Sequence, residues 1–151
     1  MAKKKILCVA SIGGHWVQLL RISKPLEQYY DIAYMSTREK CATMVGERPF
    51  YLMRDFSRWD AWKLIPEFFH QWRVQRQIKP QAVISTGAAP GLICLLVAKL
   101  RGSMTIWIDS EANVEQPSAS GKIASRFADY AYTQWQDLAH GKFRYAGNIF
   151  G

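Results

Sequence analysis

Two glycines and a histidine end the first apolar run of the chain. In ILCVASIGGHWVQLLRI (residues 6–22), Gly13, Gly14 and His15 stand between a β-like run and a stretch with helical spacing. Glycine lets a ligand approach the backbone closely, and the free N–H groups at a helix start attract phosphate. A neutral imidazole beside that phosphate could accept a proton. The pattern predicts a phosphate-binding turn with His15 as a catalytic base; a structural histidine is the alternative.

A second glycine turn follows another apolar run. The segment STGAAPGL (residues 85–92) places Gly87 directly after the β-like run 82–86. The carboxyl ends of parallel strands meet at one edge of a sheet, where ligands bind. We therefore expect this turn and the Gly13–Gly14 turn to form the floor of one cleft. The chain has neither GxxxxGK[ST] nor GxGxxG followed by an acidic residue, so a P-loop is excluded and a nicotinamide site is disfavoured. We expect no cofactor and no metal.

Short apolar runs alternate with helical patterns along the whole chain. The predicted strands are residues 5–11, 31–36, 50–53, 82–86, 104–109, 129–133 and 144–147. The predicted helices are 16–26, with Pro25 marking its end, 38–45, 59–77, 91–100 and 120–127. This alternation predicts an α/β fold with a doubly wound, mostly parallel, Rossmann-like sheet covered on both faces. We expect a single domain over residues 1–151.

Composition and charge narrow the function classes. The net charge of +8 favours an anionic partner. The cysteines Cys8, Cys41 and Cys94 form no CxxC pair, and two of them lie in apolar runs, which predicts buried thiols in a reducing cytosol. No signal peptide is evident, and the longest uninterrupted apolar segment, residues 92–98, falls far short of the roughly 20 residues of a spanning helix.

An aromatic stretch lies in the middle of the chain. RWDAWKLIPEFFHQWRVQRQIKP (residues 58–80) spaces its large apolar side chains as one helix face, with a kink or restart predicted at Pro66. One reading is an ordinary helix that packs this stripe on the sheet. The other is an interfacial helix on an anionic membrane, since tryptophans flanked by basic residues are typical of such helices. The candidate membrane-binding residues are Trp59, Trp62, Phe69, Trp72, Arg73 and Arg76.

Four motifs in order carry a family resemblance. SIGGHWVQLLRI, VISTGAAPGL, IWIDSEANVEQPSASGKIA and TQWQDLA resemble PssD-like proteins, relatives of the membrane-associated subunit of a two-part N-acetylglucosaminyltransferase of lipid-linked oligosaccharide assembly. More remotely, the chain resembles the N-terminal half of MurG-like enzymes. The resemblance implies one half of an inverting GT-B glycosyltransferase of polysaccharide or exopolysaccharide biosynthesis. This half would bind a polyprenyl-diphosphate-linked acceptor and dock peripherally on the cytoplasmic face of the inner membrane.

The resemblance also implies a partner and site roles. A separate small subunit would supply the UDP-sugar site, so the enzyme would be a heteromer that is active only when both halves are present. Gly13 and Gly14 would lie near a diphosphate and His15 near the acceptor hydroxyl. Asp109 replaces a glutamate of the family pattern; it is followed by Ser110, with Glu111 as a nearby substitute. Gly87, Ser110 and Glu111 complete the expected acceptor site. A loop or capping role for Asp109 is an equal alternative, as is a simple helix start for SASGK.

Two other function classes are weighed against this interpretation. A self-contained Rossmann-like nucleotide-binding enzyme, such as a reductase, would need the acidic ribose ligand that the pattern lacks. A nucleic-acid-binding domain has no recognisable motif here, and its aromatics would alternate with Lys and Arg rather than gather on one stripe. We therefore expect no nucleic-acid partner.

Overall fold

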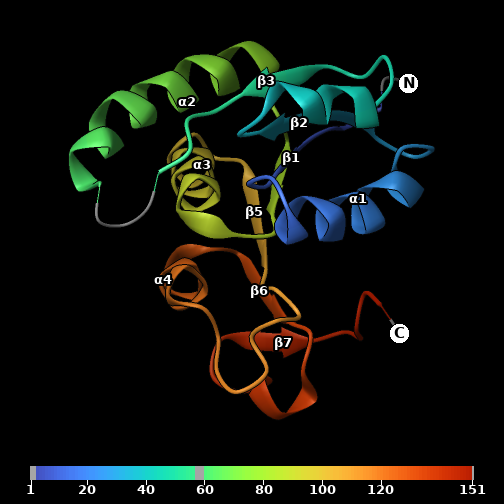
Figure 1. The fold of residues 1–151 in the computed structure, drawn as a ribbon, viewed down its shortest axis with the longest axis vertical. Helices are drawn as coiled ribbons and strands as arrows, with labels where there is room; N and C mark the ends of the chain where they lie inside the picture. The colour runs from blue at the N-terminus through green and yellow to red at the C-terminus, as the bar shows by residue number, and fades with distance from the viewer. Residues whose placement is uncertain (1–2, 57–59, 151) are drawn as a thin grey trace.

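The computed structural model describes residues 3–56 and 60–150, and its centre is one seven-stranded sheet (Figure 1). The strand order is β3-β2-β1-β4-β5-β6-β7, and every neighbouring pair is parallel. The strands are β1 (Lys5–Val9), β2 (Asp31–Ser36), β3 (Phe50–Leu52), β4 (Ala82–Ser85), β5 (Met104–Ile108), β6 (Tyr130–Thr133) and β7 (Phe143–Tyr145). The predicted doubly wound α/β fold is confirmed, with a sheet that is parallel throughout.

Helices cover both faces of the sheet. They are α1 (Gly14–Leu26), η1 (Glu39–Met44), η2 (Ala61–Lys63), α2 (Leu64–Ile78), α3 (Ala88–Leu100), α4 (Ala119–Phe127) and η3 (Gln136–Leu138). Figure 1 shows α2, α3 and α4 on one side of the sheet and α1 on the other. This layering follows from the right-handed crossovers between parallel strands, because the chain winds outward from β1 in both directions.

Alternation along the strands builds two cores. Leu7 and Val9 of β1 point into the layer under α2, α3 and α4, whereas Ile6 and Cys8 point into the layer under α1. Trp16 of α1 fills the second layer. The three cysteines are buried and free, as predicted. Cys8 and Cys41 belong to the α1 layer and Cys94 to the other, and burial raises the pKa of the Cys8 thiol to about 12.

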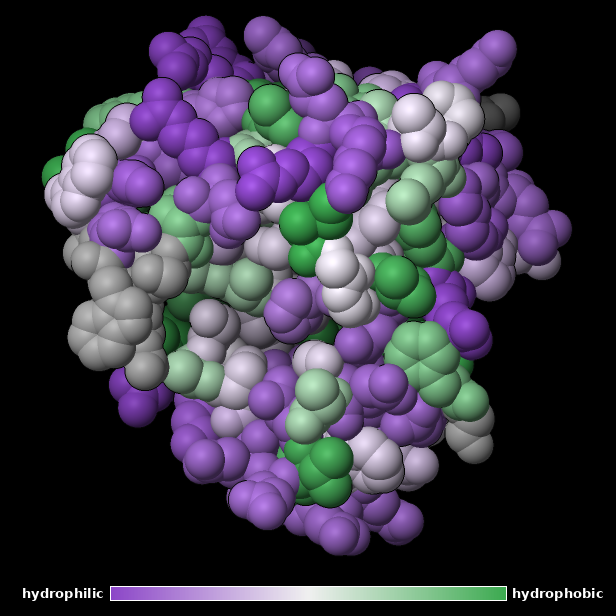
Figure 2. Space-filling view, in the orientation of Figure 1, coloured by the Kyte–Doolittle hydropathy of each residue, from purple (hydrophilic) through white to green (hydrophobic). Residues whose placement is uncertain are grey.

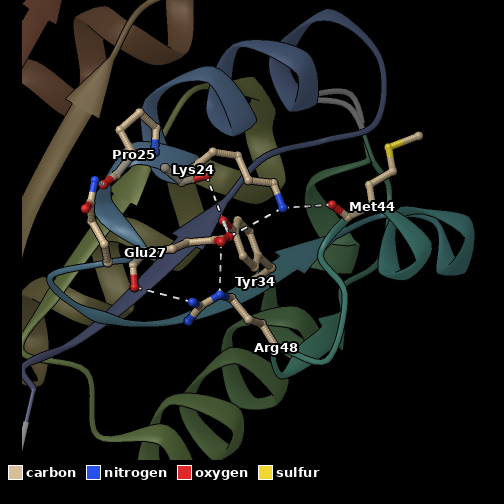
Figure 3. Close-up of polar contacts among 8 residues, drawn as sticks. Lys24, Pro25, Glu27, Tyr34, Met44 and Arg48 are labelled. Atoms are coloured by element: carbon tan, nitrogen blue, oxygen red, sulfur yellow. Dashed lines mark hydrogen bonds and ion pairs between the residues drawn. The ribbon is translucent and has the colours of Figure 1, made fainter.

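A cluster around Glu27 ties the end of α1 to β2 and to the loop before β3 (Figure 3). The Tyr34 hydroxyl donates to Glu27 Oε1 at 2.6 Å, and Arg48 Nε lies 3.1 Å from Oε2. Lys24 lies 3.4 Å from the same carboxylate and donates to the Met44 carbonyl. Partial burial opposes ionisation, but the Tyr34 hydrogen bond and the two cations outweigh it and lower the pKa of Glu27.

Several predicted boundaries move when the chain folds. Helix α1 starts at Gly14, two residues before the predicted start, and ends at Leu26 as predicted. Of the two alternatives at Pro66, the structure shows a restart: the 3-10 turn η2 ends at Lys63 and α2 starts at Leu64. Pro66 therefore lies in the first turn of α2, where its missing N–H group leaves no intrahelical bond unmade. Helix α3 begins at Ala88 rather than at residue 91. Its first residue, Ala88, has a φ of 69°. Alanine rarely adopts this left-handed conformation, so the sequence does not predict it.

Helix α2 presents its apolar stripe outward. Trp62, in the preceding turn, is 73% exposed, Ile65 68% and Phe69 60%. In Figure 2 hydrophobic side chains break the largely hydrophilic surface at the upper left, over α2. Of the alternatives left open, the one in which the whole stripe packs on the sheet does not hold: Trp62, Ile65 and Phe69 face outward. Trp72 differs from the others, because it stacks on Phe68 and lies under the Arg101 guanidinium; Trp59 lies outside the described residues.

The buried face of α2 is largely polar. Glu67, Gln71 and Gln75 are fully buried beside Val74 and Ile78. Gln71 donates to Glu67, and Gln75 donates to the carbonyl and the sulfur of Cys94 on α3. One acceptor oxygen of each of these three residues has no hydrogen-bond partner in the described part of the chain. Within residues 3–56 and 60–150, no helix combines the length and the apolar character needed to cross a membrane.

Candidate active site at the carboxyl edge of the sheet

The two glycine turns meet where the sheet changes winding direction. Strands β1 and β4 are neighbours, and their following helices lie on opposite faces. Such a switch point opens a crevice at the carboxyl ends of the strands. The turns are joined directly, because Thr86 N donates to Val9 O at 3.3 Å and the Thr86 hydroxyl donates to His15 O at 2.6 Å. The structure thus brings together the Gly13–Gly14 turn, His15 and Gly87.

His15 is held in one orientation and one tautomer. Its Nδ1 lies 3.1 Å from the carbonyl oxygen of Thr86. A carbonyl can only accept, so Nδ1 carries the proton in the neutral ring and Nε2 keeps its lone pair. The half-buried imidazole therefore combines a fixed orientation with a free basic nitrogen, which is the geometry of a general base.

Gly87 provides the space that His15 occupies. Its φ is +143°, and a Cβ at this position would lie 2.4 Å from His15 Nδ1. Any side chain here would displace the imidazole. Thr86, which holds the imidazole, was not among the predicted site residues; its place between a strand end and Gly87 is the sequence signal that could have identified it.

The first glycine turn is open to a ligand. Gly13 has a φ of +102°, and a Cβ at Gly13 or Gly14 would meet no described atom within 4 Å. Helices α1 and α3 both start here without a side-chain cap or an acidic residue in the first turn. Their first N–H groups therefore carry partial positive charge toward the crevice, which favours a phosphate there.

Asp109 lies at the same edge but is occupied by the fold. Its carboxylate is 2% exposed and accepts hydrogen bonds from Trp107 Nε1 at 3.0 Å, Ser118 N at 2.9 Å and Ser118 Oγ at 2.6 Å. Ser118 in turn caps α4 by accepting from Gly121 N. These contacts are those of the loop-anchoring alternative, in which the carboxylate satisfies backbone and side-chain donors.

Ser110 and Glu111 belong to a buried amide network. Gln18 Nε2 donates to Ser110 Oγ at 3.0 Å, and Gln18 Oε1 accepts from Glu111 N and from Gln134 Nε2. Gln134 also accepts from Ile149 N, so the network reaches the end of the described chain. The Glu111 side chain lines a hollow of about 500 Å³ beside Trp135. Gln18 and Gln134 were not predicted, because an isolated glutamine gives no periodicity or motif.

The predicted membrane-binding residues fall into two groups. Trp62, Phe69 and Arg73 line one cavity beside α2, and Arg76 is exposed on the same helix. Trp72 packs against its own helix, as described above. Across the described residues, no group of three or more His, Cys, Asp or Glu side chains is arranged to hold a metal ion.

Comparisons with known proteins find one similar glycosyltransferase sequence and several solved structures with a similar fold. No family model matches it. A UDP-N-acetylglucosamine–N-acetylmuramyl-(pentapeptide) pyrophosphoryl-undecaprenol N-acetylglucosamine transferase from Ruminiclostridium cellulolyticum is 27% identical over 152 residues, which cover 89% of this chain and 40% of that protein. The chain therefore spans well under half the length of this curated relative.

Solved structures share the fold. The crystal structure of Acinetobacter baumannii MurG superposes with a TM-score of 0.80 at 18% identity, over 95% of this chain and 45% of that one. The UDP-N-acetylglucosamine 2-epimerase of Rickettsia bellii gives a TM-score of 0.71 at 13% identity, over 98% of this chain and 46% of that one. The chain thus has the fold of one half of MurG, a Rossmann-like GT-B domain around an all-parallel sheet, and its sequence is similar to part of a glycosyltransferase.

Proposed function

We propose that this chain is the acceptor-binding, membrane-docked subunit of a split inverting glycosyltransferase, as the PssD-like resemblance implies. The enzyme would move a sugar from a UDP-sugar to a polyprenyl-diphosphate-linked saccharide in polysaccharide biosynthesis. The observation that carries this proposal is the His15 imidazole, fixed by Thr86 with Nε2 free, in a crevice between two helix starts without side-chain caps. The similarity to part of an undecaprenol-linked N-acetylglucosamine transferase supports the glycosyltransferase role.

The proposed chemistry uses the chain's own groups. The acceptor hydroxyl attacks the anomeric carbon while the bond to the UDP oxygen breaks, and the hydroxyl proton passes to His15 Nε2. UDP leaves with the bonding electron pair. The backbone N–H groups at Gly13 and Gly14 favour the charge of a diphosphate, of the donor or of the acceptor, without a metal. Gly87, Ser110 and Glu111 would contribute to acceptor binding, as the resemblance implies, whereas Asp109 supports the fold of the loop that carries Ser110 and Glu111.

Reconstitution with a donor-binding partner tests this function. The chain is expected to transfer labelled N-acetylglucosamine from its UDP donor into a polyprenyl lipid extract only when a small GT-B donor subunit is added, because the cleft needs both halves. The chain alone and the partner alone are the controls. Robust transfer by this chain alone would contradict the split enzyme, and tight UDP-sugar binding without a partner would favour a self-contained nucleotide-binding enzyme.

Peripheral attachment through α2 is the second part of the proposal. Replacing Trp62 and Phe69 by glutamate is expected to weaken flotation with anionic vesicles by roughly tenfold per residue, since burying a large apolar side chain is worth about 1.5 kcal/mol or more. Trp72 is left unchanged because it packs against Phe68.

A matched pair of substitutions distinguishes the α2 face from general surface hydrophobicity. Tyr29→Glu with Ile123→Glu changes side chains that are 67% and 51% exposed on other elements, and it is expected to leave flotation unchanged. If the Trp62 and Phe69 variant keeps its circular dichroism spectrum and floats like the parent chain, α2 is not the membrane contact.

A further inference from the structure

A basic cavity lies at the same edge of the sheet as the His15 crevice, but beyond β2 and β3. Its volume is about 1150 Å³. One wall comes from the segments that follow β2 and β3, through Thr37, Arg38 and Arg54, and the other from the start of α2 and its first turns, through Phe69 and Arg73. None of the glycine-turn residues lines it.

The cavity carries a strong local excess of positive charge. Its basic lining residues are Arg38, Arg54, Lys63 and Arg73, against one acidic residue, Asp55, in the described part of its wall. Lys63 is weakly paired, 3.9 Å from Asp60. The guanidinium groups of Arg38 and Arg73 make no hydrogen bond or ion pair with any described residue. Arginine groups that are not already committed to carboxylates are suited to a phosphate, which they bind through paired N–H donors.

An apolar groove adjoins this cavity. Phe69 lines both, and the groove of about 420 Å³ runs between α2 and α3 with walls that are almost wholly apolar. Its other lining residues are Leu64, Ile65, Phe68, Ile93 and Leu96. A basic pocket that opens onto a hydrocarbon-lined groove matches a ligand in which a phosphate is joined to a hydrocarbon chain.

The inner end of the cavity reaches the glycine turn. Thr37 lines the cavity, and its hydroxyl accepts a hydrogen bond from Ile12 N at 3.0 Å, immediately before Gly13. A phosphate held by Arg38 would therefore lie on a path from the exposed α2 face toward the crevice of His15.

We propose that this cavity binds the phosphate or diphosphate group of a membrane lipid, with its hydrocarbon chain over the α2–α3 groove. The inference deepens the proposed function, because the lipid-linked acceptor is one source of such a group and an anionic phospholipid is the other. Binding itself requires no partner subunit and no sugar transfer, so it can fail or succeed independently of the glycosyltransferase assignment.

Flotation of the full chain with three kinds of vesicle tests the site. The vesicles are pure phosphatidylcholine, phosphatidylcholine with phosphatidylglycerol, and phosphatidylcholine with a small fraction of undecaprenyl diphosphate at equal surface charge. Arg38→Gln with Arg73→Gln is expected to bind at least one anionic vesicle roughly 30-fold more weakly, since each basic residue near an anionic leaflet changes partition about fivefold. Lys142→Gln with Arg144→Gln, at the opposite edge strand, removes the same charge and is expected to have little effect.

Each outcome bears on the proposal. Selective loss of binding to undecaprenyl diphosphate vesicles supports the cavity as an acceptor diphosphate site, and selective loss with phosphatidylglycerol supports it as a phospholipid headgroup site. Equal binding by the Arg38 and Arg73 variant and the parent chain overturns the proposal. So does equal weakening by the control pair, which would show that net charge alone is responsible. Competition by soluble pyrophosphate at concentrations that match the lipid would overturn the lipid part of the assignment.

Discussion

Replacing His15 by alanine is expected to lower kcat of the reconstituted transferase by roughly 10²-fold or more, the usual loss when a general base is removed. The structural reason is the bond between Nδ1 and the Thr86 carbonyl, which leaves Nε2 as the proton acceptor. The measurement is single-turnover transfer at saturating donor and acceptor, with the partner subunit present. Vesicle binding and the thermal unfolding midpoint should stay close to those of the parent chain.

A matched variant separates the base from the fold. His15→Asn keeps a donor that can reach the Thr86 carbonyl but has no basic nitrogen, and it is expected to be as slow as the alanine variant. Near-full turnover by both variants would remove His15 from the chemistry. If Asp109→Asn then lost turnover with its stability unchanged, the carboxylate would be the base. If that variant also stayed active, the base would belong to the partner subunit.

Replacing Asp109 by alanine is expected to reduce the free energy of unfolding by about 3 kcal/mol, because hydrogen bonds to a buried charged group are worth more than neutral ones and their donors would lose their partner. Trp107 Nε1, Ser118 N and Ser118 Oγ are those donors. Urea denaturation followed by circular dichroism gives the value. The loss should appear without any ligand, substrate or partner present.

Ser118→Ala is the comparison for Asp109. It removes the cap of α4 and one bond to the carboxylate, and it should cost about 1 kcal/mol. Asp109→Asn keeps the size of the side chain but turns one acceptor into a donor, so its cost should lie between the two. If the Asp109→Ala variant is as stable as the parent chain but has lost sugar transfer, Asp109 has a catalytic role rather than a structural one.

The sheet was predictable because parallel strands that are buried on both faces read as short apolar runs. The strand at residues 31–36 was predicted with its observed bounds, since Asp31 and Ser36 bound a run of four apolar residues, 32–35. The start of α3 was missed by three residues because the small side chains of its first turn give no periodicity, and its first residue, Ala88, has a positive φ that alanine rarely adopts.

The sequence predicted the part of the candidate site that is formed by the glycine turns, but not the part that is formed by buried glutamine side chains. The convergence of Gly13, Gly14 and Gly87 follows from the placement of strand ends, which the alternating pattern fixes. The pairing of Gln18 with Gln134, 116 positions apart, does not, because any polar residue can satisfy a buried donor. The sequence also left open which way the apolar stripe of α2 faces. The stripe has the same helical period whether it packs on the sheet or faces the solvent.

The three buried thiols make the two layers of the molecule separately observable. Cys8 and Cys41 lie in the α1 layer, and Cys94 lies against Gln75 of α2 in the other. A thiol that is buried and protonated reacts with an alkylating reagent only when its surroundings open. The rate at which each cysteine is labelled, read by mass spectrometry, therefore reports how often its own side of the sheet opens. If α2 loosens at a vesicle surface, the labelling rate of Cys94 should rise while the labelling rates of Cys8 and Cys41 stay the same.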